Sequence, residues 1–143
     1  MDPHERHHRR HRFHRLALAA PILAFVPLYL LPWNPIYAGI ASLAIGAVAG
    51  MACRPDLTRR IMLGGALFGA LYAVFIFGLR VGVPGYIEAV WNLGDLSGVS
   101  LAGVPLEELL FGITFGMYWS GVYEHLTWHT GVRQPAAVRP RSA

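Results

Sequence analysis

The chain contains four long apolar stretches, separated by short segments that are charged or rich in turn-forming residues. A helix of about 20 apolar residues is long enough to cross the roughly 30 Å hydrocarbon core of a bilayer. The composition agrees, because 55% of the residues are hydrophobic and only 14% are charged, which is too little polar surface for a soluble globule of this size. We therefore predict an all-α membrane protein with one transmembrane domain, residues 16–130. Its four predicted spans are 16–33, 36–53, 61–79 and 104–128.

The segments outside these spans differ in character. The longest connection, residues 86–103, is too polar to span a bilayer and too apolar to be disordered, so an interfacial segment is expected before the last span. Residues 1–15 are rich in His and Arg and are predicted to form a basic tail. Residues 131–143 are predicted to form a second, disordered basic tail.

The arginines predict the orientation of the chain in the membrane. All 12 basic residues are arginines, and most of them lie in the N-terminal tail, the 54–60 loop and the C-terminal tail. An even number of spans places these three segments on one side, which is the cytoplasmic side by the positive-inside rule. A multi-pass protein of the inner (cytoplasmic) membrane with both termini in the cytoplasm is expected. Nucleic-acid binding is not expected, because no recognition module accompanies the arginines.

Two adjacent carboxylates, Glu107 and Glu108, lie near the outer end of the last span. Pro105 is expected in the first helical turn, where its missing N–H is not needed. The helix dipole favours negative charge in that turn, so the two acids could simply cap a buried helix start. The alternative interpretation is chemical. Two neighbouring carboxyl groups in an apolar environment cannot both ionise easily. Glu107 and Glu108 are therefore expected to share one buried proton, so that one of the two stays protonated at neutral pH. Such a group can act as a general acid.

Two faces of the same helix support the chemical interpretation. At 100° per residue, one face carries aromatic rings that could stabilise a carbocation; ordinary packing is the alternative for any one of them. These residues are Phe111, Phe115, Tyr118 and Trp119. The adjacent face has Gly112, Gly116 and Ser120 at the small-xxx-small spacing that allows close helix packing. Two earlier pairs, Gly46/Gly50 and Gly65/Gly69, have the same spacing.

No metal site is predicted. The tail histidines could capture a metal, although contact with lipid headgroups is the more ordinary role for such a tail. They are His4, His7, His8, His11 and His14. His125 and His129 share a helix face and could bind zinc, but no third ligand is apparent, so they are expected to be interfacial anchors. Cys53 is the only cysteine and is interpreted as a small apolar filler.

The segment Gly-Val-Pro-Leu-Glu-Glu-Leu-Leu-Phe at 103–111 resembles the Pro-x-Glu-Glu signature of the membrane-embedded lycopene cyclase domain family, the cyclase type without a Rossmann motif. Val-Trp-Asn-Leu-Gly-Asp-Leu-Ser-Gly-Val at 90–99 is similar to the segment before that signature, and the similarity covers residues 60–128. The resemblance implies non-redox, proton-initiated closure of a carotenoid end group into a ring. Glu107 and Glu108 would supply the proton, and no cofactor would be needed.

Further residues and a partner are expected at this site. Trp91 would help the aromatic face shape a cavity for a carotenoid or another polyene lipid, and Arg80 and Asp95 would tune the acids. Arg80 could equally be an anchor at the membrane surface. Family cyclases usually combine two such domains, so the chain is expected to pair with itself or with a second cyclase half.

Two other functions stay open on the sequence. Glutamate-dependent intramembrane proteases also carry adjacent glutamates on a span, but their pattern has an arginine shortly after the pair, and positions 109–113 are Leu-Leu-Phe-Gly-Ile. The other alternative is a non-enzymatic membrane bundle that binds a lipid or a partner protein, with the glutamates as helix caps.

Overall fold

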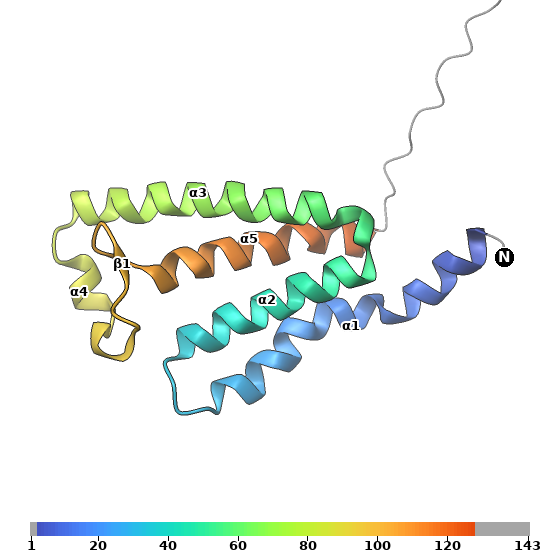
Figure 1. The fold of residues 1–143 in the computed structure, drawn as a ribbon, viewed down its shortest axis with the longest axis horizontal. Coiled ribbons are helices and arrows are strands. Elements are labelled where there is room, and N and C mark those ends of the chain that lie inside the picture. Colours follow the sequence, from blue (N-terminus) through green and yellow to red (C-terminus); the bar gives the residue numbers. More distant parts are fainter. Residues whose placement is uncertain (1–2, 128–143) are drawn as a thin grey trace, which may run out of the picture.

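Four long helices form an up-and-down bundle in the computed structural model (Figure 1). The structure describes the backbone of residues 3–127 and, within that range, the side chains of 13–123, 125 and 126. The N-terminus, the connection between the second and third helices and the end of the last helix lie at one end of the bundle. The long helices are α1 (Pro3–Tyr29), α2 (Pro35–Cys53), α3 (Thr58–Gly82) and α5 (Leu106–Thr127).

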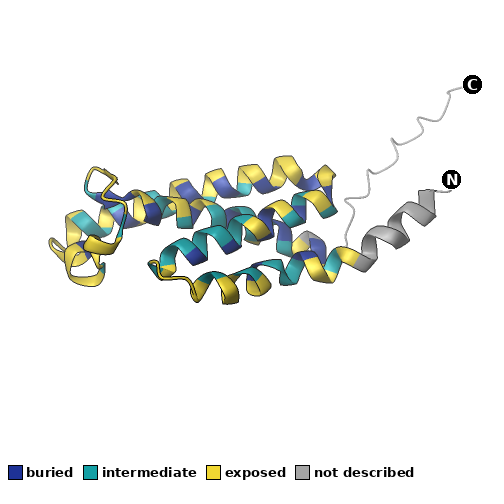
Figure 2. Cartoon of the chain, turned by 60° about the horizontal axis from the view of Figure 1, so that its bottom comes forward, coloured by how far each residue is buried: buried dark blue, intermediate teal, exposed yellow. Residues whose placement is uncertain are grey.

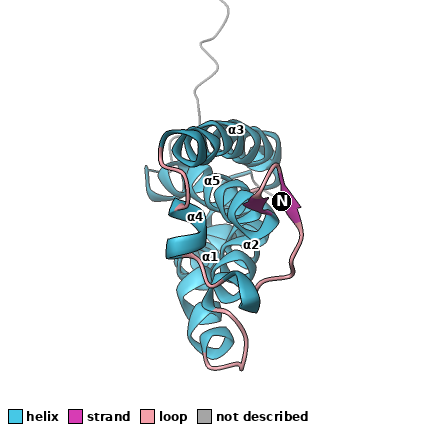
Figure 3. Cartoon of the chain, turned by 90° about the vertical axis from the view of Figure 1, so that its left-hand side faces the viewer, coloured by secondary structure: helices cyan, strands magenta, loops and turns pink. Residues whose placement is uncertain are grey.

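The last helix is the centre of the bundle. Seen along the bundle, α5 lies between α3 and α2, and α1 covers the outer side of α2 (Figure 3). The short element η1 (Pro55–Leu57) joins α2 to α3. Because α5 contacts both neighbours along its length, side chains at its start meet groups from two other helices.

The connection before α5 is folded into a compact cap at the other end of the bundle. It contains α4 (Tyr86–Val90), η2 (Leu93–Asp95) and a hairpin of β1 (Ser100–Leu101) and β2 (Val104–Pro105). The strands pair antiparallel, with Ser100 opposite Pro105 and Leu101 opposite Val104. The expectation that Pro105 lies in the first helical turn is therefore wrong. Pro105 is in β2, and α5 begins at Leu106 rather than at residue 104.

The basic N-terminal segment is helical from Pro3 onward. Helix α1 begins at Pro3 and runs through residues 3–15 into the apolar part. Arginine is a good helix former, and proline is well suited to a helix start, so a helix extends readily through this polar sequence. Pro21 and Pro27 lie inside α1. The helix ends at Tyr29, four residues before the predicted end of the first span. Residues 131–143 lie outside the described residues.

Small residues bring α3 and α5 into close contact, as their spacing predicts. A Cβ atom added at Gly116 would lie 2.5 Å from the Cβ of Phe68 and 2.9 Å from the carbonyl oxygen of Gly64. One added at Gly69 would lie 2.5 Å from Ile113. Gly46 similarly accepts the close approach of other helices to α2. The glycine faces therefore set the distance between the helices.

The outer surface of the bundle is apolar. On α3, Leu67, Leu71 and Val74 are 72%, 66% and 71% exposed, and Figure 2 shows exposed residues along the outer side of the bundle. Two helical segments, Pro35–Cys53 and Pro55–Gly82, are long and apolar enough to cross a membrane. This indicates association with a membrane. The apolar part of α1, Phe13–Tyr29, is shorter.

Gly103 in the hairpin is expected to be intolerant of a side chain. Its φ is +77°, and an added Cβ would lie 1.2 Å from Nη1 of Arg80. Gly98 has the same φ of +77° but has nothing within 4 Å of that position. Gly98→Ala should therefore lower the free energy of unfolding by about 1–2 kcal/mol through backbone strain alone. Gly103→Ala should cost about 1–3 kcal/mol more, because the arginine must move as well.

Thermal unfolding of both variants in detergent measures this difference. Equal losses of stability would show that the arginine does not occupy the space beside residue 103.

Candidate active site

Glu107 and Glu108 are both buried at the start of α5, with exposed fractions of 3% and 1%. The hairpin explains their position. Val104 is fully buried, and the backbone N–H of Leu106 donates to the carbonyl of Val99, 3.0 Å away. These contacts hold the first turn of α5 beneath the connecting segment. Buried acidic groups need hydrogen-bond partners, because moving a carboxyl group without a partner out of water costs several kcal/mol of free energy.

Glu107 receives two hydrogen bonds on one oxygen. Its Oε1 accepts from the hydroxyl of Tyr37 at 2.8 Å and from the backbone N–H of Ser97 at 2.9 Å. Tyr37 belongs to α2, and Ser97 belongs to the connection before the hairpin. The other oxygen, Oε2, is buried and has no hydrogen-bond partner. Glu107 thus ties the connection to α2 and keeps one oxygen available.

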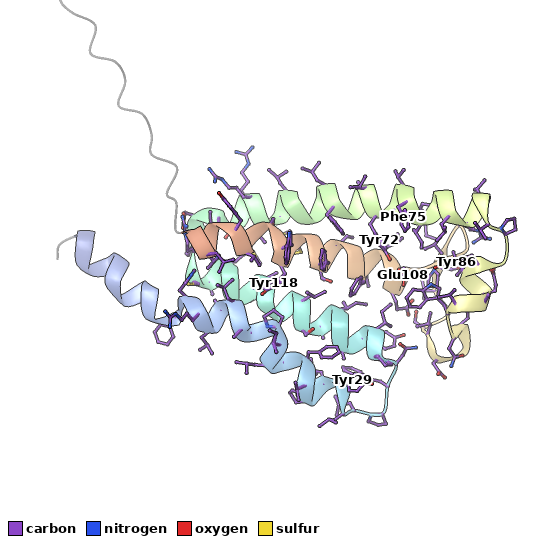
Figure 4. The ribbon with its side chains drawn as sticks, turned by 180° about the vertical axis from the view of Figure 1, so that it is seen from behind. Tyr29, Tyr72, Phe75, Tyr86, Glu108 and Tyr118 are labelled. Carbon is purple, nitrogen blue, oxygen red and sulfur yellow. The ribbon has the colours of Figure 1, made fainter. Side chains whose placement is uncertain are left out.

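Glu108 has a different neighbour. Its Oε2 accepts a hydrogen bond from the hydroxyl of Tyr72 on α3, and Figure 4 shows these two side chains next to each other. Within residues 3–127, no hydrogen bond joins the two carboxyl groups. Each carboxyl group instead accepts from a tyrosine of a different helix, Glu107 from Tyr37 on α2 and Glu108 from Tyr72 on α3.

Aromatic rings extend from Tyr72 along the interface of α3 and α5. Phe68 lies 6.3 Å from Tyr72 and 5.2 Å from Phe115 between ring centroids. Phe115 in turn lies 6.2 Å from Phe111 and 5.9 Å from Trp119. We call these five residues the aromatic row. It begins at the tyrosine that donates to Glu108 and contains three of the four predicted aromatic residues, Phe111, Phe115 and Trp119, but not Tyr118.

Three other predicted site residues make no hydrogen bond to the acids in the described part of the chain. The hydroxyl of Tyr118 donates to the carbonyl of Leu18 at 2.8 Å, so this side chain joins α5 to α1. Trp119, although part of the aromatic row, is 62% exposed. Trp91 packs against a buried cluster of Ile76, Ile87 and Val104 beneath the cap.

The two predicted tuning residues make no contact with the acids through hydrogen bonds or ion pairs in the described part of the chain. Nη1 of Arg80 is buried without a hydrogen-bond partner, and its guanidinium lies against Gly103. Arg80 also lines a cavity of about 250 Å³ under the hairpin. Asp95 is exposed and accepts a hydrogen bond from the side chain of Asn92.

The tyrosines that bind the acids were not predicted. A usable signal exists, because a tyrosine hydroxyl inside an apolar span needs a partner, and both Tyr37 and Tyr72 lie in predicted spans. The role of Ser97 could not be recognised from the sequence, because its donor is the backbone N–H, which almost every residue has.

The family model described as lycopene cyclase matches residues 34–126, which is more than half of the chain and includes both glutamates and all three of their donors. No curated protein and no solved structure matches the chain. Family membership supports a carotenoid cyclase-type role. The bundle with paired acids at the start of its central helix belongs to the lycopene cyclase family.

Proposed function

We propose that the chain closes the acyclic end group of a carotenoid into a ring by proton transfer, without a redox step. The observation that carries the proposal is the burial of Glu107 and Glu108, each beside a tyrosine hydroxyl, with the aromatic row beginning at one of them. A buried acid next to apolar surface can deliver a proton to a hydrocarbon, and aromatic faces can stabilise the cation that results.

The hydrogen bonds favour separate roles for the two acids. Glu107 accepts from two donors, an arrangement that suits a carboxylate, and has a free oxygen, Oε2. Glu108 accepts from Tyr72 alone and lies at the head of the aromatic row. In the proposed reaction Glu108 is the acid and Glu107 is the base.

The proposed step balances without an oxidant or reductant. The carboxyl group of Glu108 transfers its proton to one carbon of the terminal double bond, which leaves a cation on the other carbon. The electron pair of a second double bond then forms the new carbon–carbon bond and closes the ring. Loss of a proton to Glu107 restores a double bond. The proton returns to Glu108 before the next turnover, so the net reaction is an isomerisation.

The cap would keep water away from this chemistry. The N–H of Ser97 holds the connection over Glu107, and Val104, three residues before Glu107, is fully buried. Water would intercept the cation, so exclusion of water protects the ring-closing step. The substrate then needs the cap to move, or a second copy or another cyclase half to complete the entrance. We propose that the chain pairs in this way.

We also propose that all four long helices span the membrane. The N-terminus, the basic 54–60 loop and the end of α5 lie at one end of the bundle (Figure 1). With that end in the cytoplasm, as the positive-inside rule predicts, the acids and the cap lie near the opposite surface of the inner membrane. Fusion of a periplasm-specific reporter after residue 96 and after residue 143 tests this orientation. Only the first fusion should be active.

Pigment analysis in a bacterial host that accumulates lycopene tests the function. The chain is expressed alone and together with a second half from another lycopene cyclase. Ring-containing carotenoids in either culture are expected. If neither culture forms rings while the chain is present in the membrane, the cyclase proposal is wrong and the non-enzymatic bundle is favoured.

Tyr72→Phe is expected to slow ring formation about tenfold without abolishing it. Phenylalanine keeps the ring in the aromatic row and removes only the hydroxyl that positions Glu108, a loss of about 1–2 kcal/mol. The ratio of cyclic to acyclic carotenoid measures the effect. Tyr29→Phe, at an exposed hydroxyl far from the acids in Figure 4, is the matched control. Equal activity of both variants would contradict the positioning role.

A further inference from the structure

We propose that His14, Cys53 and His125 form a binding site for a zinc-class transition metal ion, at the end of the bundle opposite the carboxyl pair. The three residues come from α1, α2 and α5. One ligand atom of each, an imidazole nitrogen or the sulfur, lies within 4.8 Å of the other two. Imidazole and thiolate are the ligands that zinc prefers in proteins. The proposal does not depend on the cyclase reaction.

The hydrogen bonding of His125 prepares it for a metal. Its Nδ1 lies 2.7 Å from the carbonyl oxygen of Gly121. A carbonyl only accepts hydrogen bonds, so Nδ1 carries the hydrogen and Nε2 keeps its lone pair. That Nε2 is buried without a hydrogen-bond partner, and the residue is 2% exposed. A histidine that donates one N–H to a backbone carbonyl and directs the other nitrogen to a metal is the usual pattern in metal sites.

This burial also corrects an expectation. The sequence predicts an interfacial anchor at His125, but this residue is among the most buried large side chains of the described residues. Its predicted companion, His129, lies outside the described residues. Burying an imidazole with an unused nitrogen is costly, and a bound ion would remove that cost.

The other two residues are close enough to complete the site. The rings of His14 and His125 lie side by side, with centroids 5.3 Å apart and planes 7° apart. Zinc bonds of about 2.0–2.3 Å place tetrahedral ligand atoms roughly 3.3–3.6 Å from one another. The separation of at most 4.8 Å must therefore shrink by up to about 1.5 Å, which side-chain rotation would have to supply. Cys53, at the end of α2, is predicted from the sequence to be an apolar filler. In the proposed site its thiolate is a metal ligand instead.

The location suggests what the ion does. Helix α1 packs mainly on α2 and has few contacts with α5. A metal held by His14, Cys53 and His125 would join these three helices at one point. It would fix the middle of α1, at His14, against the central helix that carries the carboxyl pair at its other end.

The test must separate this site from the histidine-rich N-terminal sequence, which can bind metal by itself. We therefore use the full chain with His4, His7, His8 and His11 replaced by glutamine as the background. This variant is the matched control, because it removes four imidazoles and leaves the proposed ligands intact. Cys53→Ser and His125→Gln are then made in that background, and circular dichroism verifies that each remains helical.

Titration with Co²⁺ in detergent, under reducing and oxygen-free conditions, reports the ligand set directly. The background variant should bind about one equivalent per chain, with a thiolate-to-cobalt charge-transfer band that Zn²⁺ abolishes. Cys53→Ser should lose that band, and His125→Gln should weaken cobalt binding at least about tenfold. Absence of the band in the background variant, or its persistence in Cys53→Ser, overturns the proposal.

A second measurement uses the single cysteine. Zn²⁺ should slow the reaction of Cys53 with a maleimide by at least about tenfold in the background variant, because a metal-bound thiolate is a poorer nucleophile. His125→Gln should remove this protection. If zinc gives no protection in the background variant, or protects both variants equally, the three residues do not form a common site.

Discussion

Replacing Glu108 by glutamine is expected to reduce ring formation by a factor of about 100 or more. Glutamine has nearly the same shape and its oxygen can still accept the hydrogen bond from Tyr72, so the fold should be retained. It carries no transferable proton, however, and a positioned general acid contributes about 10²–10⁴-fold to a reaction rate. The yield of cyclic carotenoid per amount of membrane-inserted protein measures the loss.

Two companion variants sharpen this prediction. Glu107→Gln should also lose most ring formation, because the amide cannot take up the proton that leaves the ring. Glu88→Gln, at an exposed glutamate in the same cap, is the matched control and should stay within about twofold of the unmodified chain. Full activity of Glu108→Gln at a normal protein level would refute its role as the acid.

The largest effect on stability is expected at the contact between α3 and α5. In Gly116→Ala the new Cβ would lie 2.9 Å from the carbonyl oxygen of Gly64, and in Gly116→Val two more carbon atoms must fit there. Backbone atoms cannot rotate away, so the two helices must separate. We expect losses of about 1–3 kcal/mol in the free energy of unfolding for alanine, and more for valine.

The same variants should lower ring formation, because the hydrogen bond from Tyr72 to Glu108 joins these two helices. Gly78→Ala is the matched control. It lies in α3 with nothing within 4 Å of the added atom, and alanine favours a helix over glycine by up to about 1 kcal/mol. Unfolding in mixed detergent micelles compares the three variants. A stability of Gly116→Val equal to that of Gly78→Ala would show that the helices are not in close contact there.

Helix boundaries were predictable where apolar character changes abruptly. Helix α2 matches its prediction to within one residue, because Pro35 starts it and the polar 54–60 loop follows it. The start of α1 was not predictable from hydropathy, since a polar sequence of good helix formers extends a helix without any apolar pattern. The β1–β2 hairpin was missed because its strands have two residues each, which is too short for an alternating pattern.

The amino-acid sequence alone determined the helical character, the close-packing glycine faces, the position of Glu107 and Glu108 near the start of the last long helix, and the resemblance to a cyclase family. These properties depend on the order of neighbouring residues. Only the tertiary structure decided that Tyr37 and Tyr72 serve different acids, and that His14, Cys53 and His125 come together. Such contacts depend on the rotation and depth of each helix against the others, which the packing of the whole bundle sets.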